Sequence, residues 1–277
     1  MKSLTPRLAK PLALASITLL AGCGPVSALL HDPRGLPCID ADCRIRYEPG
    51  AEAYAEAIGD ILPRAKKRIE SRQGRPFGRP FVVVAFADDA DYAAANGRAS
   101  TLPHGVAFMD RITLSPRLWR DDRGELEPYL THELSHAHLL SHMSSLALIH
   151  IPAWFTEGLA VWASDGGGAT RVSPAEAARA IAEGLTIETP DETGALGQMS
   201  LPFVKDFRDD NPYRRAHMAY RQAGMFVGWL HDRDQKAFAA LLDRVVNGES
   251  FRSAFAASFG VSVALAWREF ASQTKPD

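Results

Sequence analysis

The sequence predicts a single α+β domain in which strands come first and helices follow. Short β-branched and aromatic runs lie between residues 81 and 114, whereas nearly everything beyond Glu125 has apolar residues at helical spacing. The composition is that of a globular protein, with 46% hydrophobic and 23% charged residues among 277. The 31 basic and 33 acidic residues nearly balance and form no basic block, which argues against nucleic acid as a partner.

The N-terminus has the layout of a secretory signal peptide over residues 1–22. A basic start without acidic residues precedes the apolar run Leu12 to Leu20, which is too short to span a bilayer. The run ends in Leu-Ala-Gly-Cys at 20–23, which resembles the lipobox of bacterial lipoproteins. The resemblance implies cleavage before Cys23 and lipidation of this cysteine, and hence a lipid-anchored protein of the bacterial cell envelope that faces the periplasm or cell surface. A plain signal peptide, or a buried helix with an incidental cysteine, is the alternative.

Residues 23–50 are predicted to form an irregular arm between the anchor and the domain, because Pro and Gly recur along them. Cys38 and Cys43 are an even pair in an oxidising compartment, so we predict a disulfide between them. Two reduced thiols are the alternative.

The elements of the domain, residues 51–277, follow from local patterns in chain order. Helical spacing predicts a helix over 51–71, kinked or broken at Pro63. A buried strand at 81–86 and a hairpin of 106–108 with 112–114 come next. The predicted elements that follow are a helix near 126, a helix that starts from a capping box at Ser173, and helices at 213–232 and 234–246. We therefore place the sheet and the site helices in 76–165 and a helical half in 173–272.

The chemistry is predicted within residues 126–162. His132 and His136 belong to a His-Glu-Leu-Ser-His motif, and two histidines four residues apart lie on one face of a helix, where both can bind one zinc ion. Glu133 would project beside the metal and take a proton from its bound water. Glu157 follows His136 after twenty intervening residues, and two histidines with one glutamate leave the fourth tetrahedral position open for water.

The motifs HELSH at 132–136 and WFTEGLAVW at 154–162 resemble those of the gluzincin metallopeptidases, in their aminopeptidase-N-like and peptidase-MA-like branches. The resemblance implies a zincin-like catalytic domain with one zinc ion held by His132, His136 and Glu157. It also implies Glu133 as the general base and a peptide or protein as the substrate.

A helix further along the chain extends the resemblance. Tyr220 opens the stretch YRQAGMFV, which is similar to the helix from which these enzymes present a tyrosine to the scissile carbonyl. The resemblance implies that Tyr220 stabilises the oxyanion, whereas ordinary packing is the alternative role for a tyrosine on an amphipathic helix. His217 lies three residues earlier on the same face, so it is either a second oxyanion donor or a packed residue.

The sequence also departs from the gluzincin pattern. The aspartate that braces a ligand histidine in many members is replaced by Val161, so Asp165 or a backbone carbonyl would have to take its place. The expected edge strand at 104–108 contains no glutamate to bind a free amino terminus, so aminopeptidase specificity is not supported. His138 and His142 are also four residues apart, but they lie away from the first pair and are better explained as packed or solvated than as a second metal site.

Together these features predict a zinc metallopeptidase that hydrolyses peptide bonds in the bacterial envelope. A non-catalytic zinc-binding lipoprotein, which uses the same scaffold for binding or assembly, is the alternative from another functional class. A third possibility is a lipoprotein in which the His-Glu-Leu-Ser-His motif occurs by chance. The matching positions of Glu157 and Tyr220 would then both have to be coincidental as well.

Overall fold

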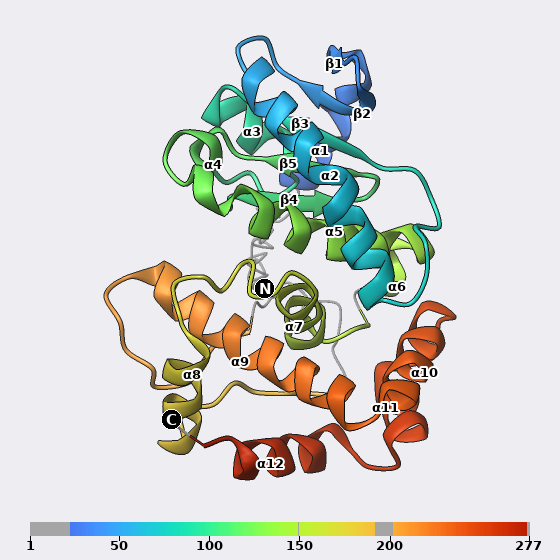
Figure 1. Cartoon of the computed structure of the whole chain (residues 1–277), viewed down its shortest axis with the longest axis vertical. Helices are drawn as coiled ribbons and strands as arrows, with labels where there is room; N and C mark the ends of the chain where they lie inside the picture. The colour runs from blue at the N-terminus through green and yellow to red at the C-terminus, as the bar shows by residue number, and fades with distance from the viewer. Residues whose placement is uncertain (1–22, 149, 192–201, 276–277) are drawn as a thin grey trace, which may run out of the picture.

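The computed structural model describes residues 23–148, 150–191 and 202–275. The described chain forms an α+β fold, with a small mixed sheet and its helices in one half and a group of helices in the other (Figure 1). This confirms the predicted α+β class, and the last strand ends before the helices of the second half begin. The predicted signal peptide, residues 1–22, lies outside the described residues.

Five strands of the described chain form the sheet in the order β1-β2-β3-β5-β4. β1 (Cys38–Ile39) pairs antiparallel with β2 (Asp42–Tyr47), and β2 pairs parallel with β3 (Val82–Ala85). β3 pairs parallel with β5 (Arg111–Leu114), which forms the predicted hairpin with β4 (Gly105–Phe108). β4 therefore lies at one edge of the sheet.

One face of the sheet is covered by two long helices. α2 (Glu52–Arg72) runs without a break through Pro63, and α5 (Leu126–His142) contains the HELSH motif. Successive side chains of a strand point to opposite faces, so alternate residues of the strands meet these helices. A row of fully buried residues that are paired across three strands forms the centre of this core: Ile45, Val83 and Ile112. The core fixes α5 firmly against the sheet.

The opposite face of the sheet and its edge carry shorter helices. α3 (Asp89–Ala95) begins at the capping residue Asp88 and packs Tyr92 against Val84 of β3. α4 (Pro116–Arg120) begins at Ser115 directly after β5. A 3-10 turn at 123–125 then leads into α5.

The helical half has its own core. Its helices are α6 (Ser145–Leu148), α7 (Ala153–Ala163), α8 (Pro174–Ala182), α9 (Pro212–Arg233), α10 (Gln235–Val246), α11 (Phe251–Phe259) and α12 (Val263–Gln273). The predicted capping box at Ser173 is present, and the helices predicted at 213–232 and 234–246 are confirmed as α9 and α10. Within the described ranges, none of the helices combines the length and the apolar character that a transmembrane span requires.

α7 and α9 cross at very short distance. A Cβ atom on Gly158 would lie 2.6 Å from the carbonyl oxygen of Ala223, and one on Gly224 would lie 2.5 Å from a methyl carbon of Val161. Both distances are shorter than real Cβ contacts, so only glycine fits at these two positions. The crossing brings α9 against the helix that carries Glu157.

The N-terminal segment differs from the irregular arm that the sequence predicted. Residues 23–30 form α1, a 3-10 turn follows at 33–35, and β1 with β2 extends the sheet itself. A disulfide joins Cys38 to Cys43 across this hairpin. Nη1 of the buried Arg111 in β5 donates to the carbonyl oxygens of Ala28 and His31, at 2.9 and 2.7 Å. Most of the segment thus belongs to the folded domain, because β2 completes a buried parallel pair.

Candidate metal centre

Three potential metal ligands lie together where α5 meets α7. His132 and His136 are one turn apart on α5, so their rings point the same way, and Glu157 comes from α7. The two Nε2 atoms are 3.2 Å apart, and they lie 3.3 and 3.5 Å from Oε2 of Glu157. His132 and Glu157 are buried and His136 is nearly so. The structure thus brings together the three residues that the sequence predicted as ligands.

The three donor atoms fit a single tetrahedral ion. A tetrahedral ion with bonds of about 2.0–2.1 Å to nitrogen and oxygen holds its ligand atoms about 3.3 Å apart. The three separations lie on either side of this value. The group can therefore hold a metal ion with three protein ligands and an open fourth position.

The charges in the group also favour a cation at its centre. Nδ1 of His132 donates to the carbonyl oxygen of Gly167 at 2.8 Å, so a neutral His132 presents a lone pair on Nε2. Burial opposes charge on His132, but hydrogen bonding to Glu157 and the nearby carboxylates raise its pKa. Burial likewise opposes charge on Glu157, but the imidazoles of His136 and His132 hold the pKa of its carboxyl well below the usual range. A metal ion would satisfy the lone pairs that otherwise compete for a proton.

Glu133 lies between the ligand helix and the edge of the sheet. Its Oε2 accepts a hydrogen bond of 2.8 Å from the backbone N–H of Ala107 in β4. A Cβ on Gly105 would lie 2.7 Å from Cγ of Glu133, so the strand passes directly over this side chain. The carboxylate is thereby held beside the potential ligands. The role of the Ala107 amide has no sequence signal, because every residue except proline supplies an N–H.

Tyr220 of α9 lies against the ring of one potential ligand. The crossing of α7 and α9 places its ring parallel to the ring of His132, with the centroids 6.3 Å apart and 18° between the planes. Burial, together with the negative charge of Glu157, raises the pKa of Tyr220 well above its usual value. The hydroxyl therefore keeps its proton and can act as a hydrogen-bond donor near the centre.

His217 has partners on both ring nitrogens. Its Nδ1 accepts a hydrogen bond of 3.1 Å from the backbone N–H of Arg171, and its Nε2 lies 3.5 Å from the hydroxyl of Tyr129. Burial, with the charge of Arg171, lowers the pKa of His217 to about 4, so the ring is neutral at pH 7. Because Nδ1 accepts, the proton of the neutral ring lies on Nε2 and is directed at Tyr129. These contacts favour packing over the alternative role of oxyanion donor.

A glycine-rich loop, residues 164–172, takes the place of the missing aspartate. Val161 packs against α9, and Asp165 forms ion pairs with two arginines of α2 instead of approaching a ligand. The ligand His132 is held by the Gly167 carbonyl, so a backbone carbonyl is the brace. Gly168 has φ +77°, and a Cβ there would lie 2.7 Å from Nδ1 of His132. The run of three glycines was the available sequence signal for this close approach.

The other histidine pair on α5 faces away from the candidate centre. Nδ1 of His138 lies 2.6 Å from Oε1 of Gln73, and Nε2 of His142 lies 2.9 Å from the carbonyl oxygen of Pro76. No second cluster of three potential ligands occurs in the part of the chain that the structure describes. The pair is therefore explained by hydrogen bonding.

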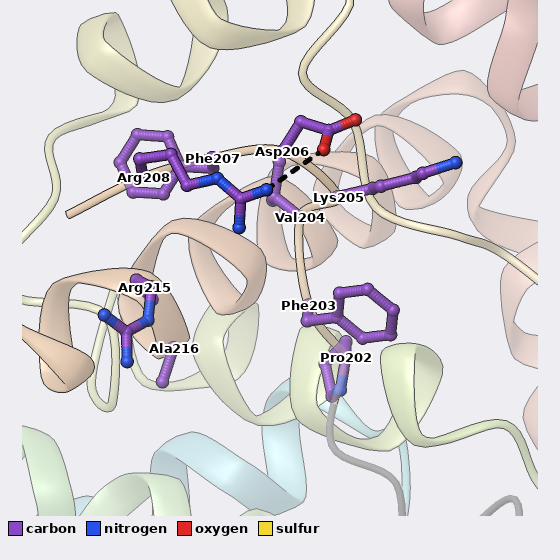
Figure 2. A pocket seen from close by; sticks show the side chains of 9 residues that line it. All are labelled: Pro202, Phe203, Val204, Lys205, Asp206, Phe207, Arg208, Arg215 and Ala216. Carbon is purple, nitrogen blue, oxygen red and sulfur yellow. Dashed lines mark hydrogen bonds and ion pairs between the residues drawn. The ribbon is translucent and has the colours of Figure 1, made fainter.

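A cavity of about 480 Å³ lies beside the start of α9 (Figure 2). It is lined by Pro202, Phe203, Val204, Lys205, Asp206, Phe207, Arg208, Arg215 and Ala216. Ala216 precedes Tyr220 by four residues, so the two share a face of α9. Its lining includes three cationic side chains and one carboxylate, that of Asp206, which pairs with Arg208 at 3.4 Å. The cavity therefore combines apolar and cationic walls one helical turn from Tyr220.

Comparison of this chain with protein-family models, with curated proteins and with solved structures finds no match in any of the three sets.

Proposed function

We propose that this protein is a zinc-dependent peptidase of the gluzincin type. The observation that carries the proposal is the triangle of donor atoms from His132, His136 and Glu157, with Glu133 beside it. Two histidines and one carboxylate with an open fourth position are typical of catalytic rather than structural zinc. A carboxylate held next to such a group supplies the base that hydrolysis requires.

The side chains around the centre can perform the proton transfers of peptide hydrolysis. Zinc, when bound, would polarise the substrate carbonyl and lower the pKa of water to about 7. Glu133 would take a proton from the attacking water and pass it to the leaving amine. Tyr220, which stays protonated and stacks on His132, would donate a hydrogen bond to the oxyanion.

An extended peptide is the substrate that the surroundings favour. β4 is the edge strand of the described sheet, and its Ala107 amide already donates to Glu133 at 2.8 Å, so this strand lies next to the proposed base. A peptide that paired with other main-chain groups of β4 would lay its backbone alongside the candidate centre.

We also propose that lipid on Cys23 holds the protein in the bacterial envelope. The proposal rests on the signal-like residues 1–22 and the Leu-Ala-Gly-Cys motif that ends at Cys23. The disulfide between Cys38 and Cys43 supports an oxidising compartment.

A peptide library tests the proposed activity. The zinc-loaded chain from Gly24 would be incubated with a diverse library, beside the same chain stripped of metal by a chelator, and the products identified by mass spectrometry. We expect cuts that depend on zinc, and their distance from the peptide ends would separate endopeptidase from exopeptidase. If no peptide is cut although one zinc is bound per chain, the non-catalytic alternative gains support.

Replacing Tyr220 with Phe should lower kcat by about 10²–10³-fold, the usual cost of one oxyanion donor. Zinc content and KM should change little, because the ring still stacks on His132. The matched control is Tyr213→Phe, two turns earlier on α9, where the hydroxyl accepts a hydrogen bond from Arg117. Equal rates for Tyr220→Phe and wild type would remove Tyr220 from the proposed machinery.

A further inference from the structure

Arg221 is a partly buried cation whose partners are all backbone carbonyls. Its Nε donates to the carbonyl oxygen of Val172 at 2.7 Å, and its Nη2 donates to that of Ala169 at 2.8 Å. Across the described ranges, no carboxylate lies within ion-pair distance of it. Burying a guanidinium without a counter-charge is costly, and burial lowers the pKa of Arg221. The contacts of Arg221 with the backbone must therefore offset this cost, which points to a function for the side chain at this position.

The backbone that Arg221 binds belongs to the glycine-rich loop 164–172. The loop lies directly on the guanidinium, since a Cβ on Gly166 would be 2.8 Å from Nη1. Two backbone hydrogen bonds close successive turns within the loop. The N–H of Ala169 donates to the Gly166 carbonyl, and the N–H of Val172 donates to the Ala169 carbonyl. The two carbonyls that accept from Arg221 thus lie on successive turns, and one side chain holds both.

The same loop contacts two histidines at the centre. The carbonyl of Gly167 accepts from Nδ1 of His132 at 2.8 Å, and the N–H of Arg171 donates to Nδ1 of His217 at 3.1 Å. Both contacts are made by backbone groups of the loop, and the Ser164 hydroxyl in the same loop also donates to the Gly167 carbonyl, at 3.5 Å. The orientation of both rings therefore depends on where the loop backbone is held.

We propose that Arg221 is a positioning residue of the metal centre, which fixes the loop 164–172 so that the Gly167 carbonyl orients His132 for metal binding. The proposal rests on the metal centre in the proposed function but not on peptidase activity. Arg221 also follows Tyr220 directly on α9. The same turn of this helix therefore carries the proposed oxyanion donor and the side chain that holds the loop against His132.

Metal affinity and the spectrum of bound Co²⁺ test this proposal without any substrate. The variants are Arg221→Met, which keeps the apolar volume, and Arg221→Lys, which keeps the charge but loses the two-pronged geometry. The matched control is Arg79→Met, because Arg79 likewise donates to two backbone carbonyls, those of Leu140 and Met143, at the far end of α5. Thermal unfolding of the metal-free chains measures the structural cost of each change.

We expect Arg221→Met to lose about 10–100-fold in zinc affinity, the usual cost of removing outer support from a ligand, and to shift the Co²⁺ absorption bands. The zinc affinity of Arg221→Lys should lie between the affinities of Arg221→Met and wild type. If Arg221→Met does not fold, the comparison with wild type is made with Arg221→Lys. Arg79→Met should bind zinc as wild type does. Wild-type affinity in both Arg221 variants, or an equal loss in Arg79→Met, would overturn the positioning role alone, whereas a wild-type chain that binds no zinc would overturn the proposed function as well.

Discussion

Replacing Glu133 with Gln should lower the rate of peptide hydrolysis by about 10²–10⁴-fold, the usual contribution of a general base, while zinc stays bound. The amide has nearly the shape of the carboxylate, and its oxygen can still accept the hydrogen bond from the N–H of Ala107. It cannot take a proton from water at neutral pH. The measurement is kcat on a cleaved peptide, together with zinc content per chain.

The matched control for this variant is Glu127→Gln on the same helix. Glu127 is more exposed than Glu133, and it pairs with Arg64 of α2 at 2.7 Å. It lies five residues before His132 and therefore on a different side of α5. Its replacement should leave hydrolysis unchanged, since an exposed ion pair contributes little. A Glu133→Gln variant that cleaves as fast as wild type would refute the general-base role, whatever the metal content.

Replacing Glu157 with Ala should weaken zinc binding by more than the ~10–100-fold that the loss of an outer partner costs, because a direct ligand is removed. The remaining two imidazoles of His132 and His136 leave the ion with half of its tetrahedral sites open. Competition with a chelator of known affinity measures the change. The metal-free chain should also lose stability, since the change breaks the buried contacts with two imidazoles that lower the pKa of Glu157.

Val161→Ala, one turn further along α7, controls for packing. Val161 contacts α9 at the crossing but no ligand atom, so this change should lower thermal stability and leave zinc affinity intact. Undiminished zinc affinity in Glu157→Ala would exclude this residue from the ligand set.

The sequence predicted the three candidate ligands because side-chain identity and helical spacing define such a group. His132 and His136 are four residues apart on a helix, and Glu157 lies on a second helix that its own periodicity indicates. The residues that support them were harder to predict. The carbonyl of Gly167 and the amide of Ala107 are backbone groups, which every residue type can offer, so only the fold determines which of them reaches the site.

Two predictions rested on local sequence, whereas the structure depends on partners from other elements. His217 shares a face of α9 with Tyr220, as the interval of three residues predicts, but the loop 164–172 and Tyr129 supply hydrogen-bond partners from other elements. Residues 42–47 alternate charged and apolar residues among prolines and glycines and were predicted as irregular. They form β2 because β3 offers a parallel partner. Their alternation is itself a strand pattern, but the prolines and glycines on either side outweighed it in the prediction.

If the protein is anchored through Cys23 as proposed, the position of α1 against the domain would limit how far it can act from the membrane. This helix begins at Cys23 and is about 12 Å long for its eight residues. Near its end, Arg111 donates to the carbonyl oxygens of Ala28 and His31. If Cys23 carries lipid as proposed, no free length of chain separates the bilayer from the folded domain. The distance from the bilayer that the candidate centre can reach would then be set by the size of the domain and not by a linker. Substrates would therefore have to come to the membrane surface to be cut.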